Sequence, residues 1–316
     1  MEPQYSNMLQ FKPIADAVDE SISYIESRKN HTINPLKTRW TKFNKVCAGG
    51  IEPGMVFTVA GASGSGKSSF VNTLETDLID LNPGEDVIVL SISFEMLSYR
   101  QVTRKISNKL RRTTTELYSG EEDLSDDDFQ KVKNVSQRIK NYPIYYVDTP
   151  GTVEEIESTI KYFHKNIAKG RWLVIILDHV LLVEGFDERK TIVDLQKMFI
   201  RCKKLFRTSI IQISQMNRNI ESPERFNNPS LHYPMRSDLA ASDAVYQASD
   251  FIIVLSRPEL QNIISYGPNH LPVQGKVYLH FLKIRDVGEP CILQFDNNLK
   301  YGDLIETAPL NNELKD

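Results

Sequence analysis

The residues best suited to chemistry lie in a glycine- and serine-rich stretch, residues 61–68, which reads GASGSGKS. This stretch satisfies the pattern G-x-x-x-x-G-K-[ST], and it falls between a β-rich run and a helical one. Glycines let consecutive backbone N–H groups point inward around phosphate oxygens, and the N-terminus of the following helix adds partial positive charge. Lys67 can then reach the β- and γ-phosphates, and the Ser68 hydroxyl can ligate magnesium. The sequence therefore predicts a nucleoside triphosphate site whose cradle comprises Ala62, Ser63, Gly64, Ser65, Gly66, Lys67, Ser68 and Ser69.

Two carboxylates are candidates for the hydrolytic machinery that a phosphate cradle alone lacks. Asp178 ends the apolar run LVIILD, and open α/β sheets bind their ligands at the carboxyl ends of strands. Because a carboxylate there is desolvated, we expect it to face a cation and to ligate magnesium. Glu95 follows the run SISF, on a strand that we expect beside the cradle strand, where it can orient the attacking water. The alternative is that Glu95 starts a helix and is stabilised by the helix dipole.

Short β-rich runs alternate with longer helical stretches from residue 55 onward. Strands are predicted at 55–60, 86–93, 143–148, 172–178, 209–214 and 251–256, and helices at 67–81, 96–111, 153–168 and 190–206. This alternation predicts an α/β fold with a mostly parallel, twisted sheet and helices on both faces. Two later runs, 276–284 and 291–295, have no helix between them and predict a C-terminal antiparallel hairpin. The acidic stretch at 120–129 predicts a helix start capped by Ser125, not a metal site.

A predicted helix over residues 11–28 carries one apolar face, formed by Ile14, Val18, Ile22 and Ile25. The pattern alone leaves open whether this face packs on its own domain or on a neighbouring subunit. We find no internal repeat and no low-complexity linker. The expected organisation is an N-terminal arm at 1–36, one main domain at 37–305 and a tail at 306–316.

The composition describes a chain that can bury a sizeable core and has little charge bias. Of 316 residues, 41% are hydrophobic, and the net charge of −3 argues against a positively coated nucleic-acid binder while permitting a local basic groove. The longest apolar run, 173–177, is too short to span a bilayer, and residues 1–10 are too polar for a signal segment. We therefore expect no membrane association. Three cysteines far apart indicate neither a disulfide framework nor a metal cluster, which favours a reducing, cytoplasmic location.

Several motifs together resemble the C-terminal, RecA-like motor domain of the DnaB-type replicative helicases, over residues 30–302. TRWTKFNKVCAGGIEPG is similar to the family's segment before the P-loop, and SISFEM and IILDHVLLVEG resemble its glutamate and magnesium-aspartate segments. ISQMNR resembles its glutamine sensor motif. PMRSDL, QASDFIIVLSR and LKIRDVGEPCILQF resemble its DNA loop, the following strand and its terminal hairpin. The resemblance implies a RecA-like P-loop NTPase that uses ATP and Mg²⁺.

The resemblance also implies a role for each matching residue. It assigns Lys67 and Ser68 to phosphate and magnesium, Glu95 to water activation and Asp178 to magnesium. Arg104 matches a nucleotide-contacting arginine of the family, nine residues after Glu95.

Three further residues match the family's sensing and trans-acting positions. Gln215 ends a predicted strand, where its amide can sense the γ-phosphate. Lys283 and Arg285 lie two apart on a predicted strand and therefore point to one face. In the family such a pair reaches the triphosphate of the neighbouring subunit, as arginine-finger charge in trans.

At the level of the assembly, the resemblance implies a homo-hexamer or another ring that moves 5′ to 3′ on single-stranded DNA, with a loader or primase as a further partner. The expected function is an ATP-dependent replicative helicase motor, with the arm helix similar to the family's linker helix. The family's N-terminal primase-binding domain has no counterpart in this sequence.

The DNA loop departs from the family pattern D-[LI]-R-E-S-G. Here residues 238–243 read DLAASD, so alanines and Asp243 replace charged and glycine positions. Backbone N–H groups can still hold phosphates, and Arg236 or Arg225 can substitute for the missing arginine. The alternative function is a RecA-like ATPase that has lost DNA translocation and acts as a regulatory or assembly factor.

Overall fold

The computed structural model describes residues 11–240, 242–285 and 288–307. The predicted polar start at 1–10, Ala241 of the DNA loop and most of the predicted tail, at 308–316, lie outside the described residues. The chain divides into two compact units, residues 1–35 and residues 36–316, and each is described by itself.

The first unit contains the predicted arm helix. Helix α1 (Ile14–Lys29) begins after Pro13, whose ring suits a helix start. Asp16 lies in its first turn and Arg28 and Lys29 in its last, which complements the helix dipole. None of its residues is buried, and the apolar stripe of the predicted helix is present as expected.

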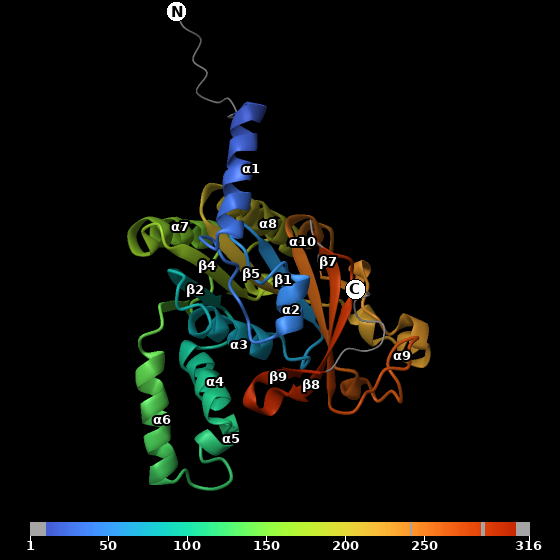
Figure 1. Ribbon diagram of the computed structural model, residues 1–316. Coiled ribbons are helices and arrows are strands. Elements are labelled where there is room, and N and C mark those ends of the chain that lie inside the picture. The colour runs from blue at the N-terminus through green and yellow to red at the C-terminus, as the bar shows by residue number, and fades with distance from the viewer. Residues whose placement is uncertain (1–10, 241, 286–287, 308–316) are drawn as a thin grey trace, which may run out of the picture. The chain divides into compact units, whose positions relative to one another are not determined.

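The second unit is built on a nine-stranded sheet in the order β3-β2-β4-β5-β1-β6-β7-β8-β9 within the described residues (Figure 1). The first six strands in this order are parallel, and β7, β8 and β9 are antiparallel. The predicted mostly parallel sheet and its antiparallel hairpin are confirmed, with β9 as an additional strand. The strand bounds are β1 Val56–Gly61, β2 Val87–Ser93, β3 Ile144–Val147, β4 Trp172–Asp178, β5 Thr208–Gln215, β6 Phe251–Ser256, β7 Lys276–Ile284, β8 Ile292–Asn298 and β9 Asp303–Glu306.

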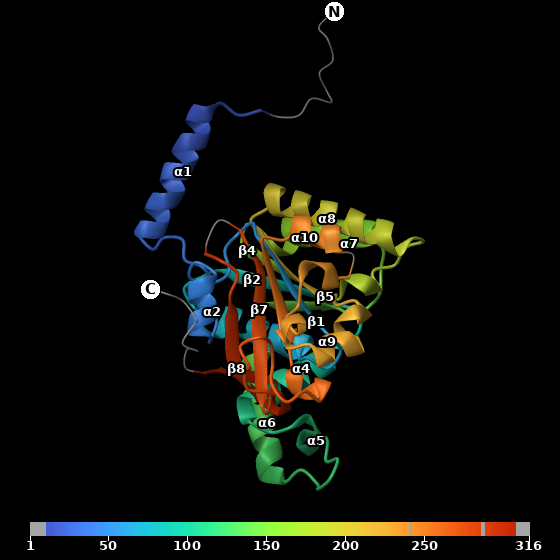
Figure 2. The same cartoon turned by 90° about the vertical axis from the view of Figure 1, so that its right-hand side faces the viewer.

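Two apolar cores, one on each face of the sheet, hold the helices in place. One core packs residues of α2 and α3, such as Phe43 and Phe70, against side chains of β1 and β6. The other packs α7 and α8, through Ile156 and Phe199, against the opposite face of β2 and β4. Figures 1 and 2 show α7, α8 and α10 gathered on one side of the sheet. The remaining bounds are α2 Thr41–Val46, α3 Lys67–Asp80, α4 Ser98–Leu110, α5 Thr114–Leu117, α6 Asp126–Ile139, α7 Val153–Phe163, α8 Glu188–Leu205, α9 Pro223–Asn227 and α10 Ser242–Ala248.

Local sequence signals explain the helix ends. The Ser125 hydroxyl accepts the Asp128 N–H and starts α6, as predicted, with three aspartates in the first turn. The predicted helix at 153–168 differs in its last part, because α7 ends at Phe163 and continues as a π-helix over His164–Ala168. Among the described residues, no helix is both long and apolar enough to cross a membrane.

One part of the predicted arrangement is wrong. The strand that leads to Glu95, β2, does not lie beside the cradle strand β1, because β4 and β5 lie between them. The hydrophobic pattern of a strand buried on both faces is the same at any inner position, so it does not reveal the strand order.

Candidate nucleotide-binding and hydrolysis site

The P-loop connects β1, which ends at Gly61, to α3, which begins at Lys67. Gly64 and Gly66 have φ angles of 75° and 99°, in the left-handed region that favours glycine. The Lys67 ammonium donates to the carbonyl oxygens of Gly61 and Ala62, both at 2.8 Å, so it closes over its own loop. Burial lowers the pKa of Lys67, although Asp178 and Glu95 nearby favour its charged form. Strand, loop and helix thus have the arrangement that the motif predicts.

A cavity of about 260 Å³ opens above this loop and brings together most of the predicted site residues. Residues far apart in the sequence meet there, and most of them follow the carboxyl ends of parallel strands, which share one edge of the sheet. The predicted residues that line it are Ser63, Gly64, Gly66, Lys67, Ser68, Ser69, Glu95, Arg104 and Gln215. Ala62 and Ser65 line an adjoining cavity of about 240 Å³ on the other side of the loop.

Asp178 has the environment of a metal ligand. It ends β4, is 9% exposed, and its Oδ1 atom has no hydrogen-bond partner among the described residues. Burial raises its pKa to about 6, although a hydrogen bond from Ser68 and the charge of Lys67 lower it. A buried carboxylate oxygen without a partner, beside a serine hydroxyl at the start of a P-loop helix, fits the oxygen ligands that Mg²⁺ requires.

Glu95 reaches the cavity from a turn and not from a neighbouring strand. It lies between the end of β2 and the start of α4, so it does not start the helix as the alternative proposed. Its side chain is 57% exposed, and its Oε2 atom lies 3.9 Å from Nε2 of His179. Gln215, at the end of β5, contacts the same ring atom, with its amide nitrogen 3.1 Å from His179 Nε2.

His179, Arg257 and Leu299 line the cavity and were not predicted. His179 is buried, and burial lowers its pKa below the ordinary value. Its position directly after Asp178, at the end of a strand, is the sequence feature that could have predicted it as a site residue. Arg257 follows the end of β6 and donates to Glu259 Oε1 at 2.6 Å. Leu299 follows β8, far from the motif in sequence, and carries no chemical signal of its own.

Arg104 is placed in the cavity by α4, which sequence spacing alone did not establish. Burial lowers its pKa, while the charges of Asp178 and Glu95 oppose that shift. A guanidinium in this position stays charged, because even a lowered arginine pKa lies above neutral pH. Together with Lys67 it balances the two carboxylates and leaves donors available for an anion.

Lys283 and Arg285 do not line this cavity. Lys283 lies on β7 and donates to the carbonyl oxygen of Tyr246 at 2.5 Å. Arg285 lies one residue beyond the end of β7, so the prediction of two strand residues is wrong, although its N–H still donates to the Asp250 carbonyl at 2.9 Å. Its guanidinium donates to the Gln247 carbonyl at 3.2 Å and pairs with Asp250 at 2.8 Å. Both cations therefore lie against α10 and the turn that follows it.

The loop that leads to α10 offers fewer phosphate ligands than we expected. Arg225 is buried and pairs with Asp238 at 2.6 Å, so it holds the loop together and cannot substitute as a DNA ligand. The Ala240 N–H donates to the Gln215 carbonyl at 3.0 Å, so it is not a free phosphate donor either. Arg236 is exposed, pairs with Asp243 at 2.8 Å and lies 4.2 Å from the Tyr246 ring centre. Arg236 therefore offsets the negative charge of Asp243.

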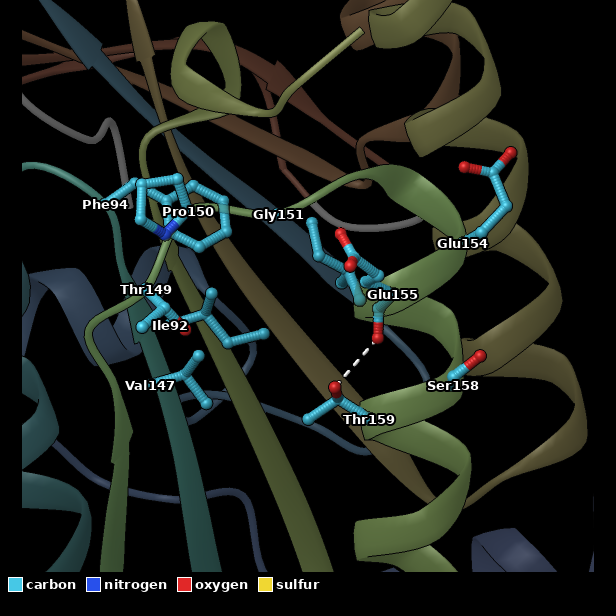
Figure 3. Close-up of a pocket in the computed structure, with 11 residues that line it drawn as sticks. Ile92, Phe94, Val147, Thr149, Pro150, Gly151, Glu154, Glu155, Ser158 and Thr159 are labelled. Atoms are coloured by element: carbon cyan, nitrogen blue, oxygen red, sulfur yellow. Dashed lines mark hydrogen bonds between the residues drawn. The ribbon is translucent and has the colours of Figure 1, made fainter.

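A second cavity, of about 480 Å³, lies between β2, β3 and α7 (Figure 3). Its apolar wall includes Ile92, Phe94 and Val147, and Glu154 and Glu155 come from the first turn of α7. Glu155 accepts the Thr152 N–H in the cap of that helix. None of the predicted site residues lines this cavity.

The parallel sheet, the glycine loop at the end of β1, the buried aspartate at the end of β4 and the glutamine at the end of β5 define a P-loop NTPase of RecA-like fold. The chain belongs to the DnaB-like helicase C terminal domain family, whose model matches residues 35–280. The fold class that the sequence predicted, and the resemblance on which it rested, are confirmed.

Two curated relatives and two solved structures illustrate this membership. Replicative DNA helicase DnaB of Pasteurella multocida (strain Pm70) is 24% identical over 79% of this chain and 52% of its own length. The DnaB of Haemophilus influenzae (strain ATCC 51907 / DSM 11121 / KW20 / Rd) is 23% identical over the same shares. A solved ATPase domain matches with a TM-score of 0.77 at 20% identity, covering 95% of this chain and all of that one. A DnaB-like replicative helicase, studied with its interactions with primase, matches with a TM-score of 0.76 at 19% identity, covering 95% of this chain and 68% of that one. The chain spans about half the length of the curated relatives it matches.

Proposed function

We propose that this chain is the ATP-dependent motor of a replicative DNA helicase, which hydrolyses ATP at subunit boundaries to move along single-stranded DNA and unwind duplex. The single observation that carries the proposal is the cavity above the P-loop, which gathers the cradle, Glu95, Arg104 and Gln215. Family membership supports the same reaction.

The residues of the cavity have distinct roles in this reaction. The amides of the P-loop bind the phosphates, and the Lys67 ammonium leaves the carbonyls of its own loop to contact them. Ser68 and Asp178 would hold magnesium, which would neutralise charge on the phosphates. Glu95 orients the attacking water and accepts its proton. Gln215 senses the γ-phosphate.

Loss of the γ-phosphate is relayed from Gln215 to the DNA loop through the backbone. The Gln215 carbonyl accepts the Ala240 N–H at 3.0 Å, and the Asn217 N–H donates to the Asp238 carbonyl at 2.7 Å. These bonds tie the end of β5 to the loop that leads to α10. A movement of Gln215 toward or away from a phosphate therefore moves that loop.

The assembly proposed is a homo-hexamer or another ring, in which Lys283 and Arg285 act on the neighbouring subunit's triphosphate. The position of both cations outside their own chain's cavity supports this role. In such a ring the apolar face of α1 docks on the next subunit. We further propose 5′ to 3′ movement, a cytoplasmic location and a loader or primase as partner; the primase proposal is supported by the DnaB-like replicative helicase that was studied with its interactions with primase.

The experiment that tests the function measures ATP turnover by the purified chain with and without single-stranded DNA, at low and moderate salt. We expect DNA to stimulate turnover, and less so at moderate salt, because phosphate contacts weaken as counterions compete. Lys67→Ala is the control and should be inactive throughout. Turnover without DNA binding or stimulation at either salt would instead identify a regulatory or assembly ATPase.

A further inference from the structure

His179 lines the cavity in a defined orientation. It directly follows Asp178 at the end of β4 and is 5% exposed. Its ring nitrogen Nδ1 accepts the backbone N–H of Leu181 at 3.3 Å, which caps the 3₁₀ turn Val180–Leu182. Burial and this hydrogen bond together fix where the other ring nitrogen points.

The hydrogen bond at Nδ1 determines where the proton of the neutral ring lies. A neutral imidazole has one donor and one acceptor nitrogen, so a ring that accepts at Nδ1 carries its proton on Nε2. Nε2 lies 3.1 Å from the Gln215 amide and 3.9 Å from Glu95 Oε2. Because an N–H can only donate, this tautomer requires the Gln215 amide to turn over, so that its oxygen replaces the amide nitrogen that lies 3.1 Å from Nε2. Its NH₂ group then faces the cavity, where a phosphate oxygen can accept from it.

The two neighbours of this N–H are the residues to which the proposed function assigns water activation and phosphate sensing. Both are acceptors, and one N–H cannot serve both fully at the same time. A turn of the exposed Glu95 side chain brings its carboxylate within hydrogen-bond distance, since only about 1 Å separates the present contact from a normal one. The position of Gln215 therefore influences the position of Glu95 through a shared donor.

We propose that His179 is a positioning residue that couples the sensor amide of Gln215 to the water-orienting carboxylate of Glu95 through its Nε2–H. The inference rests on the proposed function, because it deepens the roles given to those two residues. Within the described part of the chain, His179 belongs to no group of three metal-ligating side chains, so a role as a metal ligand has no geometric support.

Kinetics of three variants test the role of His179. His179→Phe keeps a ring of similar size without the donor, and His179→Gln restores an N–H at about the same reach. We expect His179→Phe to lower kcat on the order of 10- to 100-fold, with KM and the affinity for a fluorescent ADP changed less than about threefold. His179→Gln should recover most of kcat. His164→Phe is the matched control, because that ring packs on Phe206 outside the cavity and should leave kcat unchanged.

A double mutant separates coupling from independent effects. Gln215→Ala should lower kcat in the wild-type background but have less than about a threefold effect in the His179→Phe background. Effects that multiply, or a His179→Phe variant whose kcat stays within about twofold of wild type, would overturn the proposal. If His179→Phe no longer binds ADP, His179→Gln provides the test instead. A His179→Gln variant that binds ADP normally but does not recover kcat also contradicts the proposal.

A readout without turnover keeps this inference distinct from the proposed function. In ¹⁵N-histidine NMR spectra of the nucleotide-free chain, His179 should show the Nε2–H form, and Gln215→Ala and Glu95→Gln should each shift that resonance. An Nδ1–H ring, or a resonance that neither substitution shifts, contradicts the proposal even if the chain is an active ATPase. A chain that hydrolyses no ATP refutes the proposed function, while these spectra still decide whether the three side chains are coupled.

Discussion

Asp178, the proposed magnesium ligand, lies in an environment that destabilises its charged form. Burial raises its pKa to about 6, from an ordinary value of 3.8, because the charged carboxylate has lost water without gaining enough partners. Above pH 6 the carboxylate is ionised in both the folded and unfolded chain, and the folded state bears the desolvation cost. Two pKa units correspond to about 3 kcal/mol.

The first prediction concerns the free energy of unfolding of the magnesium-free chain. Asp178→Asn, neutral at every pH, should be more stable than wild type by about 3 kcal/mol at pH 8 and by about half as much at pH 5. The gap narrows on acidification because the folded wild type takes up its proton at a higher pH than the unfolded chain. Urea unfolding in EDTA across this range measures it.

Asp123→Asn is the control for this pH series. Asp123 is an exposed carboxylate, and its substitution should change stability by less than about 0.5 kcal/mol at any pH. If Asp178→Asn proves less stable than wild type at pH 8, the folded chain stabilises the Asp178 carboxylate. That result would contradict the interpretation that the carboxylate lacks the partner that a metal ion would provide.

Among the elements, the segment before the P-loop packs on the rest of its domain through Trp40. Trp40 stacks on Phe70 of α3 with ring centres 4.5 Å apart and meets the edge of Phe295 of β8 at 6.2 Å. Its indole N–H donates to the Leu304 carbonyl on β9 at 2.8 Å. Trp40 therefore joins the helix of the phosphate cradle to the last strands of the sheet.

The second prediction follows from this packing. Trp40→Ala leaves a cavity among three elements and an unpaired carbonyl, so it should lower the free energy of unfolding by about 3–5 kcal/mol. Lys45→Ala on α2, where the side chain is exposed, should change it by less than about 0.5 kcal/mol. Chemical denaturation of both variants gives the comparison. Similar small losses in both would mean that the segment contributes little to the fold.

At the scale of the whole molecule, Lys283 and Arg285, which we propose act in trans, lie outside the cavity above the P-loop. Tyr246 of α10 lies between Arg236 and Lys283, with the charged groups 4.2 and 4.8 Å from its ring centre. Attraction of cations to the ring face holds Arg236 and Lys283 against this one side chain of α10. In the proposed ring, a change at the loop would therefore reach the boundary between subunits through α10.

The third prediction tests the subunit boundary directly. Arg285→Ala and Lys67→Ala subunits should each be inactive alone, since one lacks the trans charge and the other the phosphate lysine. In a mixed ring, roughly a quarter of random boundaries combine an intact cradle with an intact cation. We expect the mixture to recover part of the ATPase activity.

Subunit exchange must be shown in the same samples, for example with two affinity tags. Recovery of activity supports completion of the site by the neighbouring subunit. Mixed rings that demonstrably form and stay inactive would contradict the assignment of Arg285.

The sequence by itself determined the features that are encoded locally. The P-loop, the alternation of strand and helix, the Ser125 cap and the strand ends at Asp178 and Gln215 are all readable, because motif spacing and hydrophobic period act over a few neighbouring residues.

Only the tertiary structure decided which distant residues meet. It separated β2 from β1, brought Arg104 and Leu299 into the cavity, buried Arg225 against Asp238, and placed His179 between Glu95 and Gln215. These contacts depend on strand order and on the packing of helices across the sheet. Strands buried on both faces carry the same apolar pattern wherever they lie, so no local pattern records their neighbours.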